Sequence, residues 1–295
     1  MEFGLLGPLL VKSGDTPVQV SAAKQRIVLA TLLLRANEAV SMADLAEAVW
    51  GGDPPETARV TLQNYIKRLR RALAPGGQDR IVTLSTSYEI RIDPGELDVV
   101  RVAELAATGQ AAARAHRWDH ASALLSSALA LWRGQPLADV FSEVLTLAEV
   151  PRLAALRAGA LETRIDADLH LGRHLQVIPE LQALTAAEPM RERPHELLML
   201  ALYRSGQQAA ALAVYRRARR QLIDDIGIEP GPGLRELNQK ILNSDRTLLL
   251  PPARTSSARL RRRDRACCPP VCLASSAGTP SWPRCRGYRT IRPRC

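Results

Sequence analysis

The chain has 295 residues, enough for two domains of ordinary size, and 46% of them are hydrophobic while only 4% are aromatic. We therefore expect cores built mostly from Leu, Ala and Val, as in closely packed helices. No apolar run approaches the roughly 18 residues of a membrane span, and the N-terminus shows no signal-peptide pattern. These features exclude membrane and secreted classes and predict a cytoplasmic protein.

The formal net charge of +10 belongs to the C-terminal segment. Residues 253–295 contain 11 Arg and a single acid, Asp264, while residues 1–252 hold the other 29 basic and 29 acidic side chains. All five Cys also lie in this segment, so the body fits a reducing cytosol without disulfides. Total charge is therefore no sign of nucleic-acid binding, for which only local clusters of charge count.

The first predicted elements form a small antiparallel sheet followed by two helices. We expect short strands at 2–6, 9–12 and 18–20, with a turn at 13–15. The apolar pattern of 22–36 predicts a buried helix. Ser41 is a good N-cap for a helix at 42–50, with Asp44 in the first turn, where the helix dipole favours an anion.

The stretch 56–74 predicts a helix with two unlike faces, capped by Thr57 or Asp53. Its apolar stripe, at spacings i, i+4, i+7 and i+11, consists of Leu62, Ile66, Leu69 and Leu73. Between Arg59 and Ala74 there are five basic residues and no acidic one. Such a helix can enter the major groove of DNA, where Arg pairs with guanine and Asn with adenine. In isolation, an ordinary surface helix with a solvated basic face would show the same pattern.

The neighbours of this basic helix favour DNA binding. The stiff loop 51–55 precedes it, and two strands at 81–84 and 88–92 follow it as a hairpin around residues 85–87. Strands, three helices and a hairpin, in this order, are typical of a helix-turn-helix with a β-wing, and the basic helix takes the recognition position.

On this basic helix we assign base contacts and phosphate contacts to different side chains. Arg68 is the first candidate for a base edge, with Asn64 and Thr61 on the same face. Phosphate contacts, which give position and salt dependence without sequence information, are expected from Lys67, Arg70 and Arg71.

Beyond residues 93–95 the composition becomes rich in Ala, Leu and Arg and predicts helices up to about Asn243. The expected helices are 98–116, 118–131, 143–171, 176–188, 192–205, 207–222 and 232–242. The third is expected to be kinked or split at Pro151. The fold class is therefore mainly α with small β elements.

An internal repeat appears in this helical region. Gly172 and Gly206 lie 34 residues apart and each opens a helix, and 34 residues is the tetratricopeptide period. A similar but less regular unit begins at Trp118. The sequence thus predicts stacked, tetratricopeptide-like helix pairs.

The N-terminal part resembles the OmpR-type winged helix. The resemblance is carried by the run LQNYIKRLRRAL and by a hairpin ending in Ser87 and Tyr88, where the family usually has Gly before Tyr. It implies a recognition helix in the major groove and a wing near the minor groove or phosphates, with contacts from Thr86 and Tyr88. It also implies that RNA polymerase contacts the preceding loop through Gly51, Gly52, Asp53 and Pro54.

The C-terminal part resembles the bacterial transcriptional activator domain. The strings ALALWRGQPLADV, LLMLALYRSGQQAAALAVYRRARRQL and DDIGIEPGPGLRELNQKIL carry this resemblance. In the Streptomyces antibiotic regulatory proteins this domain follows an OmpR-type winged helix. The resemblance implies a winged helix at 1–94 and an activator domain at 95–245. The remaining residues, 246–295, belong to neither domain, and their Arg, Pro and Cys content without apolar periodicity predicts a disordered tail.

The same family resemblance implies an activator of antibiotic biosynthetic genes. Its members bind double-stranded DNA at direct repeats near promoters and recruit RNA polymerase, and we expect a homodimer on the DNA. No phosphoacceptor receiver domain is present, so regulation is expected through the helical domain or through expression level.

No constellation for catalysis is visible, and we expect neither an enzyme nor a cofactor or metal site. His170 and His174 are spaced i, i+4, but Gly172 between them predicts a solvated pair at a helix break. The spacing of Cys267, Cys268 and Cys272 fits no zinc pattern, and the abrupt composition of the tail would also result from a shifted reading frame.

An alternative to the activator is a tetratricopeptide-like adaptor whose winged helix binds protein. Such an adaptor has no need for a helix with five cationic residues and no acid, and salt-titrated binding to promoter DNA separates the two functions.

Overall fold

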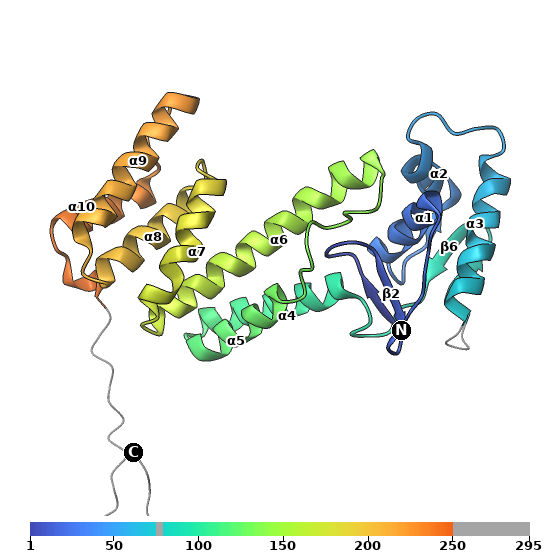
Figure 1. Ribbon diagram of the computed structural model, residues 1–295, viewed down its shortest axis with the longest axis horizontal. Coiled ribbons are helices and arrows are strands. Elements are labelled where there is room, and N and C mark those ends of the chain that lie inside the picture. Colours follow the sequence, from blue (N-terminus) through green and yellow to red (C-terminus); the bar gives the residue numbers. More distant parts are fainter. Residues whose placement is uncertain (75–78, 250–295) are drawn as a thin grey trace, which may run out of the picture. The chain divides into compact units, whose positions relative to one another are not determined.

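A computed structural model describes residues 1–74 and 79–249, and every structural statement below concerns these residues (Figure 1). The predictions for most of the tail, including its five Cys, lie outside the described residues. The first residues assigned to the tail, Arg246–Leu248, form a short 3-10 helix, η2. Its Leu248 carbonyl accepts a hydrogen bond of 2.7 Å from Arg204 Nε. None of the described helices is long and apolar enough to cross a membrane.

The first sheet is antiparallel and has the order β1 (Glu2–Gly4), β2 (Leu10–Ser13), β3 (Thr16–Pro17). The predicted strand at 18–20 is wrong, because the third strand is Thr16–Pro17 and ends before residue 18. Gly14 adopts a φ of 57°, which permits a tight turn, and Thr16 therefore already pairs with Ser13.

Three helices follow as predicted: α1 (Ala23–Leu34), α2 (Met42–Trp50) and α3 (Ala58–Leu73). The cap of α2 is confirmed. Ser41 Oγ accepts from the Asp44 N–H at 3.0 Å, and the Asp44 carboxylate accepts from the Ser41 N–H at 3.3 Å, which is a capping box. The predicted side-chain cap of α3 is wrong, because in the described part of the chain no side chain makes a capping hydrogen bond at its N-terminus.

The wing is a second antiparallel sheet with the order β4 (Val40–Ser41), β6 (Ser87–Ile90), β5 (Ile81–Leu84). The predicted hairpin is confirmed, although its second strand ends at Ile90. The pairing of β4 with β6 was not predicted, because two residues are too few to show an alternating pattern.

Seven helices complete the described chain, and the prediction of a mainly helical fold is confirmed. They are α4 (Asp98–Arg114), α5 (Trp118–Leu129), α6 (Glu143–His170), α7 (His174–Ala187), α8 (Glu192–Arg204), α9 (Gln208–Ile226) and α10 (Pro232–Leu242). α6 runs through Pro151 without a break and so is not split there, and Leu145 and Leu153 on either side are buried in one core. α9 extends four residues beyond the predicted end and stops at Gly227, whose φ of 72° is left-handed.

The two repeat glycines occupy equivalent turns. Gly172 and Gly206 have φ values of 79° and 78°, and each lies two residues after one helix and two before the next. The turn between α4 and α5 has the same layout, with His116 at a φ of 55° in the glycine position. This supports the tetratricopeptide-like spacing and its irregular first unit.

The predicted solvated pair of histidines is wrong. His170 is half-buried and its ring stacks on Trp118, with centroids 4.0 Å apart. Burial lowers the pKa of both His170 and His174. These imidazoles therefore belong to the packing between α5, α6 and α7.

The apolar interior forms two main cores, and α6 contributes to both. The first joins Phe3 and Ile66 of the N-terminal part to Leu97, Leu137 and Leu153 of the helical part. The second begins with Ile165 and Leu169 near the end of α6 and extends to Ile241 in α10. The first core therefore crosses the predicted boundary at 94/95.

Polar contacts also join the two sides of that boundary. The buried Asp98 carboxylate, at the start of α4, accepts hydrogen bonds from the N–H groups of Leu5 and Leu6 at 2.8 and 3.0 Å. Arg133 donates to the same carboxylate at 3.3 Å. Farther along, Ser142 Oγ donates to the Ala48 carbonyl of α2 at 2.6 Å. The winged helix thus has direct attachments to the helices that follow it.

Candidate nucleic-acid interface

The predicted apolar stripe fixes the orientation of α3. Leu62, Ile66, Leu69 and Leu73 are each 1% exposed or less. They lie in the first core, and α3 contacts both α1 and α2. At about 100° per residue, burying this stripe turns Asn64 and Arg71 directly outward, with Lys67 and Arg68 on either side. The separation of the helix into two faces is confirmed.

The outward side of α3 is strongly basic. We define the exposed ridge as the side chains that α3 leaves open to solvent: Arg59, Val60, Gln63, Asn64, Lys67, Arg68 and Arg71. Among the described residues, none forms an ion pair with Arg59, Lys67, Arg68 or Arg71. These four cations are therefore available to an anionic partner.

Three members of this ridge were not among the predicted contacts. Arg59, Val60 and Gln63 lie in the first two turns of α3, and Val60 is 60% exposed. Val60 lies at the helical period of Asn64, Lys67 and Arg71, so its exposure could have been found from the buried stripe alone. Thr61, in contrast, is half-buried.

Arg70 occupies a different position from the one predicted. Its Nε donates to the Ile81 carbonyl at 2.8 Å, and its Nη2 donates to Thr83 Oγ1 at 2.7 Å. Asp79 lies 3.7 Å from the same guanidinium. Arg70 therefore braces α3 against β5, and we replace its predicted phosphate contact with this structural role.

The two predicted wing residues differ in their exposure to solvent. Thr86 is exposed in the turn of the hairpin, whereas Tyr88 is 8% exposed and belongs to the first core. Its burial argues against a direct DNA contact. Ser87, which stands where the resembling family usually has Gly, lies in β6 opposite Ser41 and needs no left-handed conformation.

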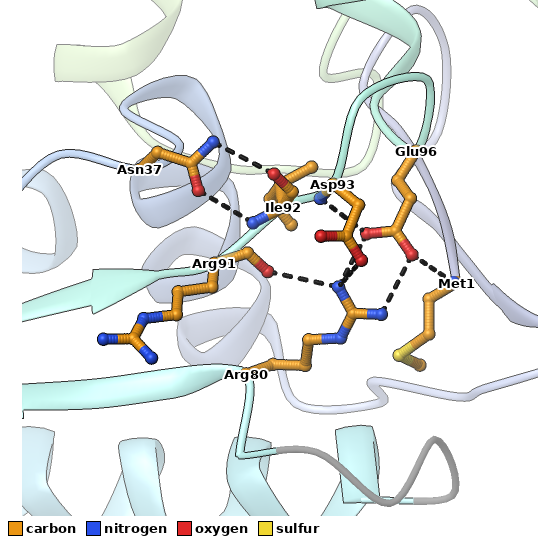
Figure 2. A network of polar contacts seen from close by, with 7 residues as sticks. All are labelled: Met1, Asn37, Arg80, Arg91, Ile92, Asp93 and Glu96. Atoms are coloured by element: carbon orange, nitrogen blue, oxygen red, sulfur yellow. Dashed lines mark hydrogen bonds and ion pairs between the residues drawn. The ribbon is translucent and has the colours of Figure 1, made fainter.

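The base of the wing is held by a network around Arg80 (Figure 2). The guanidinium of Arg80, which is 9% exposed, donates to both carboxylate oxygens of Glu96 at 2.7 and 2.9 Å. Asn37 meanwhile pairs with both the N–H and the carbonyl of Ile92. The wing is thereby tied to the segment that leads into α4.

The pKa of Glu96 reflects this network. Burial alone would raise it, but hydrogen bonds from the Met1 ammonium, from the Asp93 N–H and from Arg80 lower it below the usual value. Glu96 therefore stays ionised and keeps its charge available to Arg80.

The loop between α2 and α3 lies beside the wing. Gly52, Asp53 and Pro54 are exposed, and Gly51 ends α2 with a φ of 66°. Pro54, together with Gln63 of α3 and Thr86 of the wing, lines a hollow of about 450 Å³. The predicted polymerase-contact residues are thus accessible next to the exposed ridge.

Two protein families match this chain, one in each of its two parts. The family described as "Transcriptional regulatory protein, C terminal" matches residues 15–87, and "Bacterial transcriptional activator domain" matches residues 97–242.

Full-length relatives are similar over most of this chain. It is 43% identical to the regulatory protein AfsR of Streptomyces coelicolor over 265 residues, which covers 88% of this chain and 26% of AfsR. It is 38% identical to the regulatory protein DnrI of Streptomyces peucetius, covering 83% of this chain and 93% of DnrI. The chain therefore spans about a quarter of AfsR but nearly all of DnrI.

A solved structure shares the fold. Mycobacterium tuberculosis EmbR, determined in complex with a low affinity phosphopeptide, superposes with a TM-score of 0.80 at 37% identity. The match covers 82% of this chain and 65% of that one.

Proposed function

Because this chain belongs to the family of Streptomyces antibiotic regulatory proteins, which are transcriptional regulators, we propose that it activates transcription by binding duplex DNA through α3. The observation that carries this proposal is the exposed ridge. Four apolar side chains of α3 are buried in the core, and its opposite side presents four cations that have no ion-pair partners among the described residues. Bases are read in the major groove by such Arg and Asn side chains.

Different members of the ridge take different roles. Arg68 and Asn64 are proposed to read base edges, since a guanidinium and an amide match guanine and adenine. Lys67, Arg71 and Arg59 are proposed to hold phosphates, and Thr86 to approach the DNA from the wing. Thr61 contributes at the edge of this surface, as its side chain is half-buried.

The DNA target is proposed to be a direct repeat near promoters of an antibiotic biosynthetic cluster. Protomers bound to a direct repeat point the same way along the DNA, so the homodimer would form head to tail there. A repeat spacing of about one helical turn, roughly 10–10.5 base pairs, places the two recognition helices on one side of the duplex.

A footprint tests this target. The full chain is incubated with promoter fragments from genes beside its own, and DNase protection is mapped. We expect two protected repeats in the same orientation, and Asn64→Ala combined with Arg68→Ala should abolish the footprint. Protection that covers every fragment equally, with no defined boundary, would contradict sequence-specific binding.

RNA polymerase is the proposed partner of the loop 51–54. The loop is exposed and adjoins the surface assigned to DNA. Asp53→Ala together with Pro54→Ala should leave DNA affinity unchanged while lowering transcript yield in a reconstituted reaction. If DNA affinity falls in parallel with yield, the loop belongs to the DNA contact instead.

A further inference from the structure

A groove between α7, α8 and α9 lies outside the surface assigned to DNA. It has a volume of about 550 Å³ and is lined by Gln182 and Thr185 of α7, by Leu198 and Leu202 of α8, and by Val214 of α9. Pockets of this size hold a small molecule or a short stretch of chain rather than a folded domain. We refer to it as the α7–α9 groove.

The polar lining of this groove suits a polypeptide backbone. Gln182, Gln207 and Gln221 each offer an amide that both donates and accepts. An extended segment presents unpaired N–H and C=O groups to such amides, whereas a helix has already paired its own. Ala210 and Ala213 leave room for a backbone to approach, and the leucines can cover apolar side chains.

The charge of the groove is of one sign. Of the described residues that line it, Arg217 is the only charged one, and a second hollow shares Ala213 and Arg217 with it and continues along Arg216 and Arg220. Among the described residues, none pairs ionically with these three guanidinium groups, whereas the neighbouring Arg219 is bound by Glu229. Of the described residues that line either hollow, none is acidic. The surface is therefore complementary to carboxylates.

A buried imidazole forms part of the groove wall. His195 is 3% exposed, and its Nε2 lies 3.1 Å from the Pro189 carbonyl, so Nε2 carries the proton. Nδ1 is then an acceptor, and it has no hydrogen-bond partner among the described residues. Because Nδ1 is itself closed off from solvent, His195 shapes the groove wall and is not a direct contact for a ligand.

We propose that the α7–α9 groove binds an extended peptide segment rich in Asp and Glu. The segment's backbone pairs with the three glutamines, and its carboxylates meet Arg217, with Arg216 and Arg220 beside it. This activity goes beyond DNA binding and places a protein partner on the helical part of the chain.

Nucleic acid fits the groove less well. The cations follow one wall, and the rest of the lining is apolar or amide. Single strands also need exposed aromatic rings on which bases stack, whereas the imidazole of His195 is buried and Tyr215, which lines the second hollow, is half-buried. An acidic peptide, in contrast, can place its carboxylates at the cations, its backbone at the amides and its apolar side chains at the leucines.

Selection from random peptides tests the proposal with the full chain. Phage that display random dodecapeptides are selected on the immobilised protein, and enriched peptides are synthesised with fluorescein for anisotropy measurements. We expect Asp and Glu to outnumber Lys and Arg in the enriched set, and affinity to fall as salt rises.

Two pairs of matched variants locate the binding. Arg217→Glu and Ala213→Trp, both at exposed positions of α9, should weaken the selected peptides at least tenfold. Arg114→Glu on α4 makes the same charge change elsewhere, and Ala209→Trp adds the same bulk to α9 outside the groove, so neither should change affinity more than twofold. Circular dichroism verifies that all four variants fold.

Several results would overturn the proposal. These are enrichment without an acidic bias, no enrichment at all, or full affinity in Ala213→Trp. Loss of DNA binding in Arg217→Glu with no selected peptide would assign this face to DNA. Since Ala213→Trp should leave promoter DNA binding intact, failure of the groove and failure of the proposed activator function are distinguishable.

Discussion

Arg68 and Lys67 are adjacent exposed cations on α3, yet we expect them to contact different parts of DNA. Arg68→Ala should cost about 1–3 kcal/mol on the cognate site and relax specificity at one base pair. Lys67→Ala should weaken binding about equally on all sequences. Anisotropy titrations against the cognate site and single-base variants measure both effects. Equal weakening by Arg68→Ala on every duplex would make Arg68 a phosphate contact.

His195 gives the fold a dependence on pH. Burial lowers its pKa, with Arg217 acting in the same direction and the Pro189 carbonyl and Glu192 opposing. The unfolded chain then binds a proton more readily than the folded one. The folding stability that depends on a neutral His195 is therefore fully present above the ordinary histidine pKa of about 6.5. It decreases as the pH falls below that value.

Denaturant unfolding measured at several pH values tests this linkage. The free energy of unfolding should be smaller at about pH 5.5 than at about pH 7.5, a window in which carboxylates with ordinary pKa values remain ionised. His195→Gln should flatten this dependence without removing it, since burial also lowers the pKa of His170 and His174. An unchanged slope in the variant would show that His195 does not titrate differently on folding.

At the scale of the element, α3 and the wing act as one unit because Arg70 joins them. Arg70→Ala removes hydrogen bonds to the Ile81 carbonyl and to Thr83, and we expect a loss of about 1–3 kcal/mol of stability. The salt dependence of DNA binding should stay as it is. A slope reduced by about 1 would instead restore the phosphate contact predicted from the sequence.

The two faces of α3 could be predicted from the sequence, whereas the role of Arg70 could not. A buried stripe follows from the helical period alone, and Leu62, Ile66, Leu69 and Leu73 are buried as expected. The position of Arg70 depends on a carbonyl in β5 that the hairpin brings beside the helix. Likewise, Tyr88 is buried through the tertiary packing of β6, which no local pattern reveals.

At the scale of the whole molecule, the first core makes the winged helix depend on the helices that follow. Leu97, Leu137 and Leu153 cover the same core as Phe3, and Asp98 accepts from the N–H of Leu5. The sequence shows a change of composition near residue 94 but contains no sign of these contacts, because the partners lie far apart along the chain.

A fragment ending at Pro94 should therefore be much less stable than the full chain. It lacks the apolar side chains that cover the core, each contributing about 1.5–3 kcal/mol when buried, and it lacks Glu96, the partner of Arg80. Thermal unfolding should show a broad, low-temperature transition, while a fragment of residues 1–160, which keeps α4, α5 and the start of α6, should unfold cooperatively. A sharp transition of the short fragment at the temperature of the full chain would refute this dependence.

The exposed ridge of α3 is the feature on which the activator function depends, and the salt dependence of duplex binding tests it most directly. For the full chain on promoter DNA, the logarithm of the affinity should fall linearly with the logarithm of salt concentration. Lys67→Ala combined with Arg71→Ala should reduce this slope by about 2. A chain that binds no duplex, or a double variant with the wild-type slope, would contradict the assignment of this ridge to DNA.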